Sequence, residues 1–135
     1  MGPTILLFAA MAPFFAWTVE LFLPYPAIIE ELIKTVIVFI ILKLPYNLSR
    51  FKFCLLSGIL FAVSETFFYL FNIYLTGDLR ALLLRLILTI LLHSLTYLII
   101  LLPGIKNKRF LPIGTCLAIL LHYYYNHFIP LANVQ

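Results

Sequence analysis

Five ionisable side chains lie inside long apolar stretches of this chain: Glu30, Glu31, Glu65, His93 and His122. A charged or titratable group in the interior of a membrane is costly, so it normally faces the centre of a helix bundle and marks an ion path or a reaction centre. Carboxylates and histidines are also the side chains that most often move protons in general acid–base catalysis. The sequence therefore predicts an intramembrane site.

The string Glu30-Glu31-x-x-Lys34 places two acids and a base within about one helical turn. Residues four apart share a helix face, so we expect Lys34 to pair with Glu30. This pairing leaves Glu31, about 100° around the helix, without the lysine. A carboxylate in a poorly solvated site can act as a general base on water. The alternative is that this helix begins late and both glutamates sit at the membrane surface.

The later polar residues also follow helical spacing. Glu65 lies far from either end of its apolar stretch, so it is either a site residue or a structural partner of a base such as Arg85. His93 belongs to a polar stripe, and it is either a site residue or a hydrogen-bonding core residue. His122 and Asn126 are four apart and face the same way.

Two further polar residues are expected at the membrane surface. Glu20 lies near the end of the first apolar stretch, and His127 lies near the end of the last one. Long polar side chains near the ends of a spanning helix extend toward water. Neither residue is expected to contribute to the site.

The composition identifies the class of protein. Of 135 residues, 64% are hydrophobic and 10% are charged, whereas soluble domains average about 45–50% apolar and about 25% charged residues. The chain has too little polar surface for a soluble domain, so we expect residues 1–135 to form one integral membrane domain in the lipid bilayer. A net charge of +4 from loop lysines and arginines fits a membrane face rather than a nucleic-acid partner.

Proline, glycine and charged residues divide the chain into five apolar stretches. A spanning helix needs roughly 17–25 residues, and each stretch meets that length. We therefore expect an all-α membrane protein, a compact bundle of about five transmembrane helices over residues 4–23, 27–44, 53–75, 81–102 and 110–129. Pro13 predicts a kink in the first helix, and Pro103-Gly104 is expected to end the fourth.

The loops predict the orientation. Six basic residues fall on one side of the five spans: Lys43, Arg50, Lys52, Lys106, Lys108 and Arg109. Cytoplasmic loops carry an excess of lysine and arginine, so we expect the N-terminus inside and the C-terminus outside. Counting at about 1.5 Å per residue from the outer ends puts Glu30 about 5 Å deep and His93 about 18 Å deep. Tilted or kinked helices would have to bring these two together.

Taken together, the motifs resemble the PrsW-like branch of the CAAX-protease and bacteriocin-processing superfamily of intramembrane endopeptidases. The family pattern is EExxK or EExxxR on one helix, FxxxE or FxxxH on the next, and histidines on two later helices, the last often as HxxxN. This chain carries Glu30-Glu31-x-x-Lys34, Phe61-x-x-x-Glu65, His93 and His122-x-x-x-Asn126 in that order, over residues 30–126. Lys34 and Glu65 favour the PrsW-like branch over the prenyl-protease branch.

The resemblance implies hydrolysis of a peptide bond in a membrane-anchored protein or peptide, in the plasma membrane of a prokaryote. Glu30 would activate a water, helped by His122, and Asn126 with a histidine would stabilise the oxyanion. Glu31 and Lys34 would orient the site. Glu65 would orient a histidine or hold the water.

The chemistry of the site leaves two alternatives. Relatives have also been described as metalloproteases, and His93, His122 and Glu65 could bind Zn²⁺. No HExxH motif is present, so we expect no cofactor and a glutamate mechanism. The other alternative is a non-catalytic role, as a membrane scaffold or an immunity-type protein of the same superfamily. A small proton-coupled transporter is less favoured, because the chain lacks an inverted repeat.

Overall fold

Five α-helices and one short 3-10 helix make up the described part of the chain, which comprises residues 2–45, 47–76 and 79–128 of a computed structural model. The elements, in chain order, are α1 (Gly2–Glu20), α2 (Pro26–Ile41), α3 (Asn47–Thr76), α4 (Leu79–Lys106), η1 (Lys108–Phe110) and α5 (Leu111–Phe128). No strand occurs within these ranges. This confirms the all-α fold and the five expected helices.

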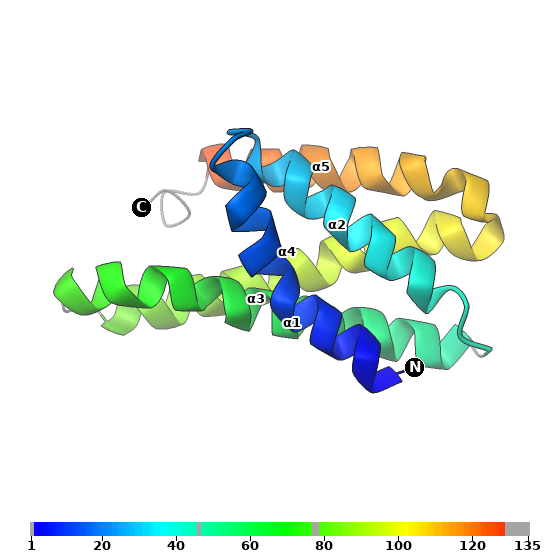
Figure 1. Cartoon of the computed structure of the whole chain (residues 1–135), viewed down its shortest axis with the longest axis horizontal. Coiled ribbons are helices and arrows are strands. Elements are labelled where there is room, and N and C mark those ends of the chain that lie inside the picture. Colours follow the sequence, from blue (N-terminus) through cyan, green and yellow to red (C-terminus); the bar gives the residue numbers. More distant parts are fainter. Residues whose placement is uncertain (1, 46, 77–78, 129–135) are drawn as a thin grey trace.

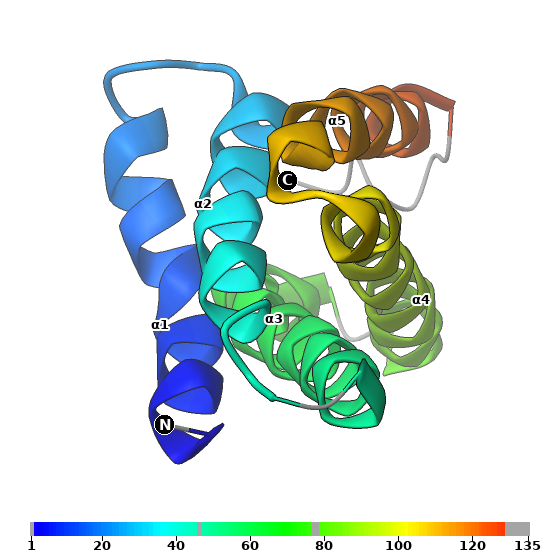
Figure 2. The same ribbon diagram turned by 90° about the vertical axis from the view of Figure 1, so that its right-hand side faces the viewer.

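The helices pack as a ring in which α1, α3, α4, α5 and α2 are successive neighbours. Successive helices of the chain run in alternating directions along the long axis (Figure 1). Seen from the end, α2 lies between α1 and α5, with α3 and α4 completing the bundle (Figure 2). α2 contacts all four other α-helices, so a side chain on its inner face can meet residues of any of them.

The bundle is apolar outside and partly polar inside. Large apolar side chains are exposed on every α-helix, for example Phe8, Val36, Phe67, Leu91 and Leu120. The charged side chains of Glu31 and Lys34, in contrast, are completely buried within it. Three helical segments, Gly2–Glu20, Ser49–Phe68 and Arg80–Lys106, are long and apolar enough to cross a membrane. This arrangement suits lipid rather than water around the protein.

Two prolines lie inside helices. α1 contains Pro13 and changes direction part-way along its length, as expected (Figure 1). Pro103 was expected to end the fourth helix, but α4 continues to Lys106. Packing explains this continuation, because Gly104 is buried against the side chains of Leu42 and Leu111. A tertiary contact of this kind can hold a helix together past a proline.

Two glycines allow the helices of the site to approach closely. A Cβ on Gly58 of α3 would lie 2.5 Å from the Cα of Ser94 in α4. A Cβ on Gly114 of α5 would lie 2.7 Å from the carbonyl oxygen of Ile99. Small residues at such contacts are typical of helix packing in membranes. They set the spacing of α3, α4 and α5 around the site.

The two expected basic loops lie at the same end of the bundle, where α2 turns into α3 and α4 turns into α5 (Figure 1). The start of α1 and the end of α5 lie at opposite ends of the bundle (Figure 1). Residues 77–78, between the third and fourth expected spans, and the expected end of the last span at residue 129 fall outside the described residues.

Candidate functional site

Lys34 on α2 is the centre of a buried polar network. Its Nζ donates to Glu31 Oε1 at 2.6 Å, to His93 Nδ1 at 2.7 Å and to Thr96 Oγ1 at 3.4 Å. An ammonium group has three donors, and each has an acceptor here. The ring of Phe61 lies 4.6 Å from Nζ and adds a cation–π contact. A fully buried lysine is therefore held by α2, α3 and α4.

His93 on α4 has both ring nitrogens engaged. Because Nδ1 accepts from Lys34, the ring proton lies on Nε2, which donates to Glu65 on α3. Arg85 Nη2 lies 3.9 Å from the same carboxylate. The histidine also stacks at an angle on Phe61, with ring centroids 4.7 Å apart. Glu65 thus fixes the tautomer and the orientation of His93.

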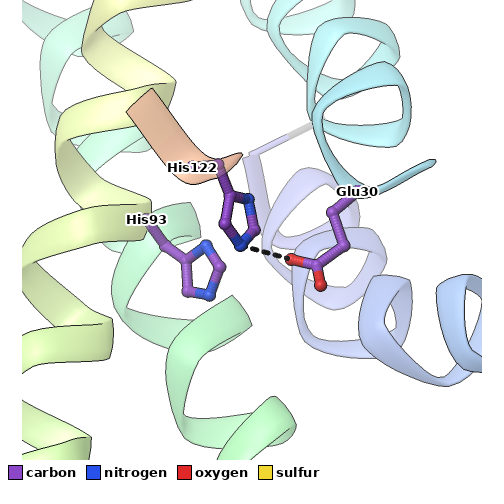
Figure 3. A group of neighbouring side chains, drawn as sticks. All are labelled: Glu30, His93 and His122. Carbon is purple, nitrogen blue, oxygen red and sulfur yellow. Dashed lines mark ion pairs between the residues drawn. The ribbon is translucent and has the colours of Figure 1, made fainter. Parts of the chain in front are cut away.

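His122 on α5 has one engaged nitrogen and one facing another acid. Its Nδ1 donates to Glu31 Oε1 at 2.7 Å, so Nε2 carries a lone pair. This Nε2 lies 4.0 Å from Glu30 Oε2, and the side chains of Glu30, His93 and His122 point toward one another (Figure 3). A carboxylate behind a histidine is the arrangement that orients a general base in hydrolases.

Glu30 is buried but lacks a hydrogen bond at one oxygen. Its exposed fraction is 8%, and Oε2 has no hydrogen-bond partner in the described part of the chain. The Lys34 Nζ lies 3.8 Å from this oxygen, beyond hydrogen-bond distance. Buried acceptors of this kind normally bind water. A water between Glu30 Oε2 and His122 Nε2 would meet two proton acceptors.

The network corrects one expectation. The expected pair of Lys34 with Glu30 is present at 3.8 Å, but the shorter contact, at 2.6 Å, is with Glu31, which was expected to lack the lysine. Both i,i+3 and i,i+4 neighbours lie on one helix face, so spacing alone could not choose between them. The helix does not begin late, because α2 begins at Pro26, before both glutamates, and both are buried in the bundle.

The expected difference in depth is absent, since Glu30 and His93 both belong to one cluster. α3 has 30 residues and α4 has 28, against 16 in α2. The ends of α3 and α4 that face each other extend beyond those of α2 and α5 (Figure 1). Counting from those ends overestimated the depth of His93.

Asn126 lies outside the network. Its side chain makes no hydrogen bond to any residue that the structure describes. It lines a groove of about 270 Å³ with Tyr123, His127 and the segment 24–28, one helical turn from His122. Asn126 therefore lies beside the site, one turn from His122 as its spacing predicted, and not within the hydrogen-bonded cluster.

Comparison of this chain with protein families, with curated proteins and with solved structures finds no match. The resemblance based on the motifs therefore stays a hypothesis.

A metal ion would have to use a different carboxylate from the one expected. Glu30, His93 and His122 each offer a ligand atom within 4.8 Å of the others, whereas Glu65 is bonded to His93. His93 has no free nitrogen, because Lys34 and Glu65 hold both. The Lys34 ammonium also lies within 4 Å of Glu30, where its charge would repel a second cation. These residues fit a metal poorly.

Two residues one helical turn from expected site residues hold Lys34. Phe61 belongs to the Phe61-x-x-x-Glu65 motif, and Thr96 lies three residues after His93. Glu20 was expected at the membrane surface, yet its Oε1 is buried without a hydrogen-bond partner among the described residues. Nothing in the sequence distinguishes it from a surface acid.

Proposed function

We propose that this chain is an intramembrane endopeptidase that hydrolyses a peptide bond of a membrane-associated protein or peptide. The observation that carries the proposal is the position of His122. Glu31 holds its Nδ1, while its Nε2 faces the unpartnered Oε2 of Glu30. This is a site for one water between two bases, inside a protein with an apolar exterior.

The proposed reaction needs no cofactor. Glu30, assisted by His122, takes a proton from the water as its oxygen forms a bond to the peptide carbonyl carbon. The carbonyl π electrons move to the oxygen. As the C–N bond breaks, the proton passes to the departing amine, and the carbonyl re-forms as a carboxyl group. General base catalysis of this kind contributes about 10²–10⁴-fold.

The remaining site residues act on the geometry. Glu31 and Lys34 hold His122 and His93, and Glu65 fixes His93. Asn126, by resemblance, donates to the oxyanion from the groove next to His122. An amide in that position would act on a substrate chain lying in the groove, which begins one turn from both Glu30 and His122.

The proposed location is the plasma membrane of a prokaryote, with all five helices in the bilayer and the N-terminus in the cytoplasm. The six basic residues at one end of the bundle support this orientation. The helices α2 and α5 are shorter, but they also expose large apolar side chains. These side chains support a position of both helices inside the bilayer.

Cleavage in liposomes tests the proposal. The purified protein is reconstituted with a library of single-span peptides, and new termini are identified by mass spectrometry. We expect defined fragments with the native protein and none with Glu30→Gln. Val36→Ala, on the lipid-facing side of the same helix, is the matched control and should cleave normally. Equal fragments from Glu30→Gln, or none from the native protein, would contradict the proposal and favour a scaffold.

A further inference from the structure

A small cavity between α1, α2 and α3 brings Glu20 beside the proposed site. Its volume is about 50 Å³, and it is lined by Pro13, Ala16, Trp17, Glu20, Glu30, Glu65 and Phe68. One water needs about 10–15 Å³, so water fits. α1 contacts α2 and α3, and all the residues that line the cavity belong to these three helices.

The walls of this cavity carry three carboxylates, those of Glu20, Glu30 and Glu65. One of the Glu20 oxygens, Oε1, is buried with no hydrogen-bond partner among the described residues. Glu30 is more than nine-tenths buried, so bulk water does not reach its oxygen directly. Polar and roomy cavities of this kind bind water, whereas apolar cavities stay dry.

Glu20 connects the cavity with the outside of the bundle. It is the last residue of α1, a helix long and apolar enough to cross a membrane, so it lies at the end of a possible membrane span. Its side chain is partly exposed, although Oε1 is buried. One carboxylate thus touches both the surface and the cavity.

Each hydrolysis consumes one water, and the water must reach Glu30 through an apolar bundle. We propose that the cavity is the water chamber of the site, and that Glu20 is a positioning residue that holds water at its mouth. The role of this water in hydrolysis rests on the proposed function. The hydration of the cavity can be measured without any cleavage.

Cysteine accessibility tests the chamber. Ala16 lines the cavity, and Ala9, two turns away on α1, is equally buried but does not line it. Each is replaced by cysteine in a Cys116→Ser background, in which Cys54 is completely buried. A water-soluble methanethiosulfonate reacts with the thiolate form. We expect Ala16→Cys to react at least about tenfold faster than Ala9→Cys, because only a hydrated thiol ionises readily.

A second position protects the test against misfolding of one variant. Pro13→Cys also lines the cavity and should react like Ala16→Cys. If both cavity positions reacted as slowly as Ala9→Cys, the cavity would be dry and the chamber would be refuted.

Glu20 is tested in the Ala16→Cys protein. Glu20→Leu should slow labelling about tenfold, whereas Glu20→Gln, which keeps hydrogen-bonding groups, should change it by less than about threefold. In the cleavage assay, Glu20→Leu should lower kcat and leave KM unchanged, and Thr18→Val, exposed on the same helix, should do neither. Unchanged labelling in Glu20→Leu would overturn the role of Glu20.

The two proposals fail separately. A hydrated cavity in a protein that cleaves no peptide would refute the protease and leave the chamber. A dry cavity in a protein that cleaves peptides would refute the chamber and leave the protease.

Discussion

At the scale of single residues, the positions of the two histidines depend on two different acids. His122 is oriented by Glu31, and His93 by Glu65. Only His122 keeps a nitrogen free to accept a proton. The geometry therefore assigns the proton-accepting role to His122 and a supporting role to His93.

Replacing Glu65 by glutamine tests that supporting role. An amide can still accept from His93, but it lacks the charge that holds the ring and that faces Arg85. Loss of a residue that orients a neighbouring site histidine typically costs about 10–100-fold, so we expect kcat to fall by that factor with KM unchanged. Steady-state cleavage kinetics measure both, and Glu65→Asp should recover part of the loss. Tyr124→Phe, exposed on α5, is the control. A Glu65→Gln protein with native kcat would remove Glu65 from the site.

The Lys34 ammonium also leads to a prediction about metal. Since Lys34 and Glu65 occupy both nitrogens of His93, a divalent ion lacks a third strong ligand at this site. Strong chelators should therefore leave the cleavage rate within about twofold, and purified protein should carry no stoichiometric zinc by elemental analysis. Loss of activity with a chelator, restored by Zn²⁺ alone, would show that Lys34 moves aside for a metal.

At the scale of the helices, the contact of α3 with α4 positions His93. Ser94, the next residue, lies so close to Gly58 that an added Cβ would be 2.5 Å from backbone Cα. Gly58→Ala must push the helices apart, and overpacking of this kind costs about 1–3 kcal/mol. We expect a lower unfolding midpoint in detergent and slower cleavage.

Gly104→Ala is the matched control for this contact. Its Cβ would meet side-chain atoms only, Leu42 Cδ1 at 2.8 Å and Leu111 Cδ2 at 2.9 Å, and the ends of these side chains can shift more readily than a backbone. A helical alanine is also favoured over glycine by about 1 kcal/mol, so we expect little net change. Equal stability of the Gly58→Ala and Gly104→Ala proteins would show that the close approach of α3 and α4 does not matter.

The helices themselves could be predicted from the sequence. Long apolar runs divided by proline and charge predicted five helices, and their ends lie within six residues of the expected ones, with the largest difference at the start of α3. The misplaced boundaries have physical causes. Pro103 did not end α4, because Gly104 packs against α2 and α5. Hydropathy could not predict that α3 and α4 extend beyond the ends of α2 and α5 (Figure 1). The extending segments are apolar, like the rest of both helices.

At the scale of the whole molecule, composition and the buried ionisable residues predicted an apolar surface around a polar interior. The hydrogen-bond partners within that interior could not be predicted. Motif spacing identified Glu30, Lys34, His93 and His122. It did not show that Lys34 bonds Glu31, because that choice depends on where α4 and α5 present their histidines. Nor did it show Glu20 in a cavity, because the path of α1 over α2 and α3 is a tertiary feature.

The orientation of the bundle gives a further prediction. With Cys116 replaced by serine, a cysteine at Lys106 should stay unlabelled by an impermeant maleimide in intact cells and become labelled after lysis. The basic end of the bundle should face the cytoplasm. A cysteine at Arg80, exposed at the opposite end, is the control and should be labelled in intact cells. Labelling at position 106 from outside would reverse the orientation.

The most direct test of the account is a double-mutant cycle of Glu30→Gln and His122→Ala in the liposome cleavage assay. If both side chains act on one water, each single variant should lose at least about 10³-fold in kcat, and the double variant should be no slower than the singles. All three must first show native unfolding behaviour in detergent. Independent losses that multiply in the double variant, or native cleavage by either single variant, would contradict a shared water and with it the proposed site.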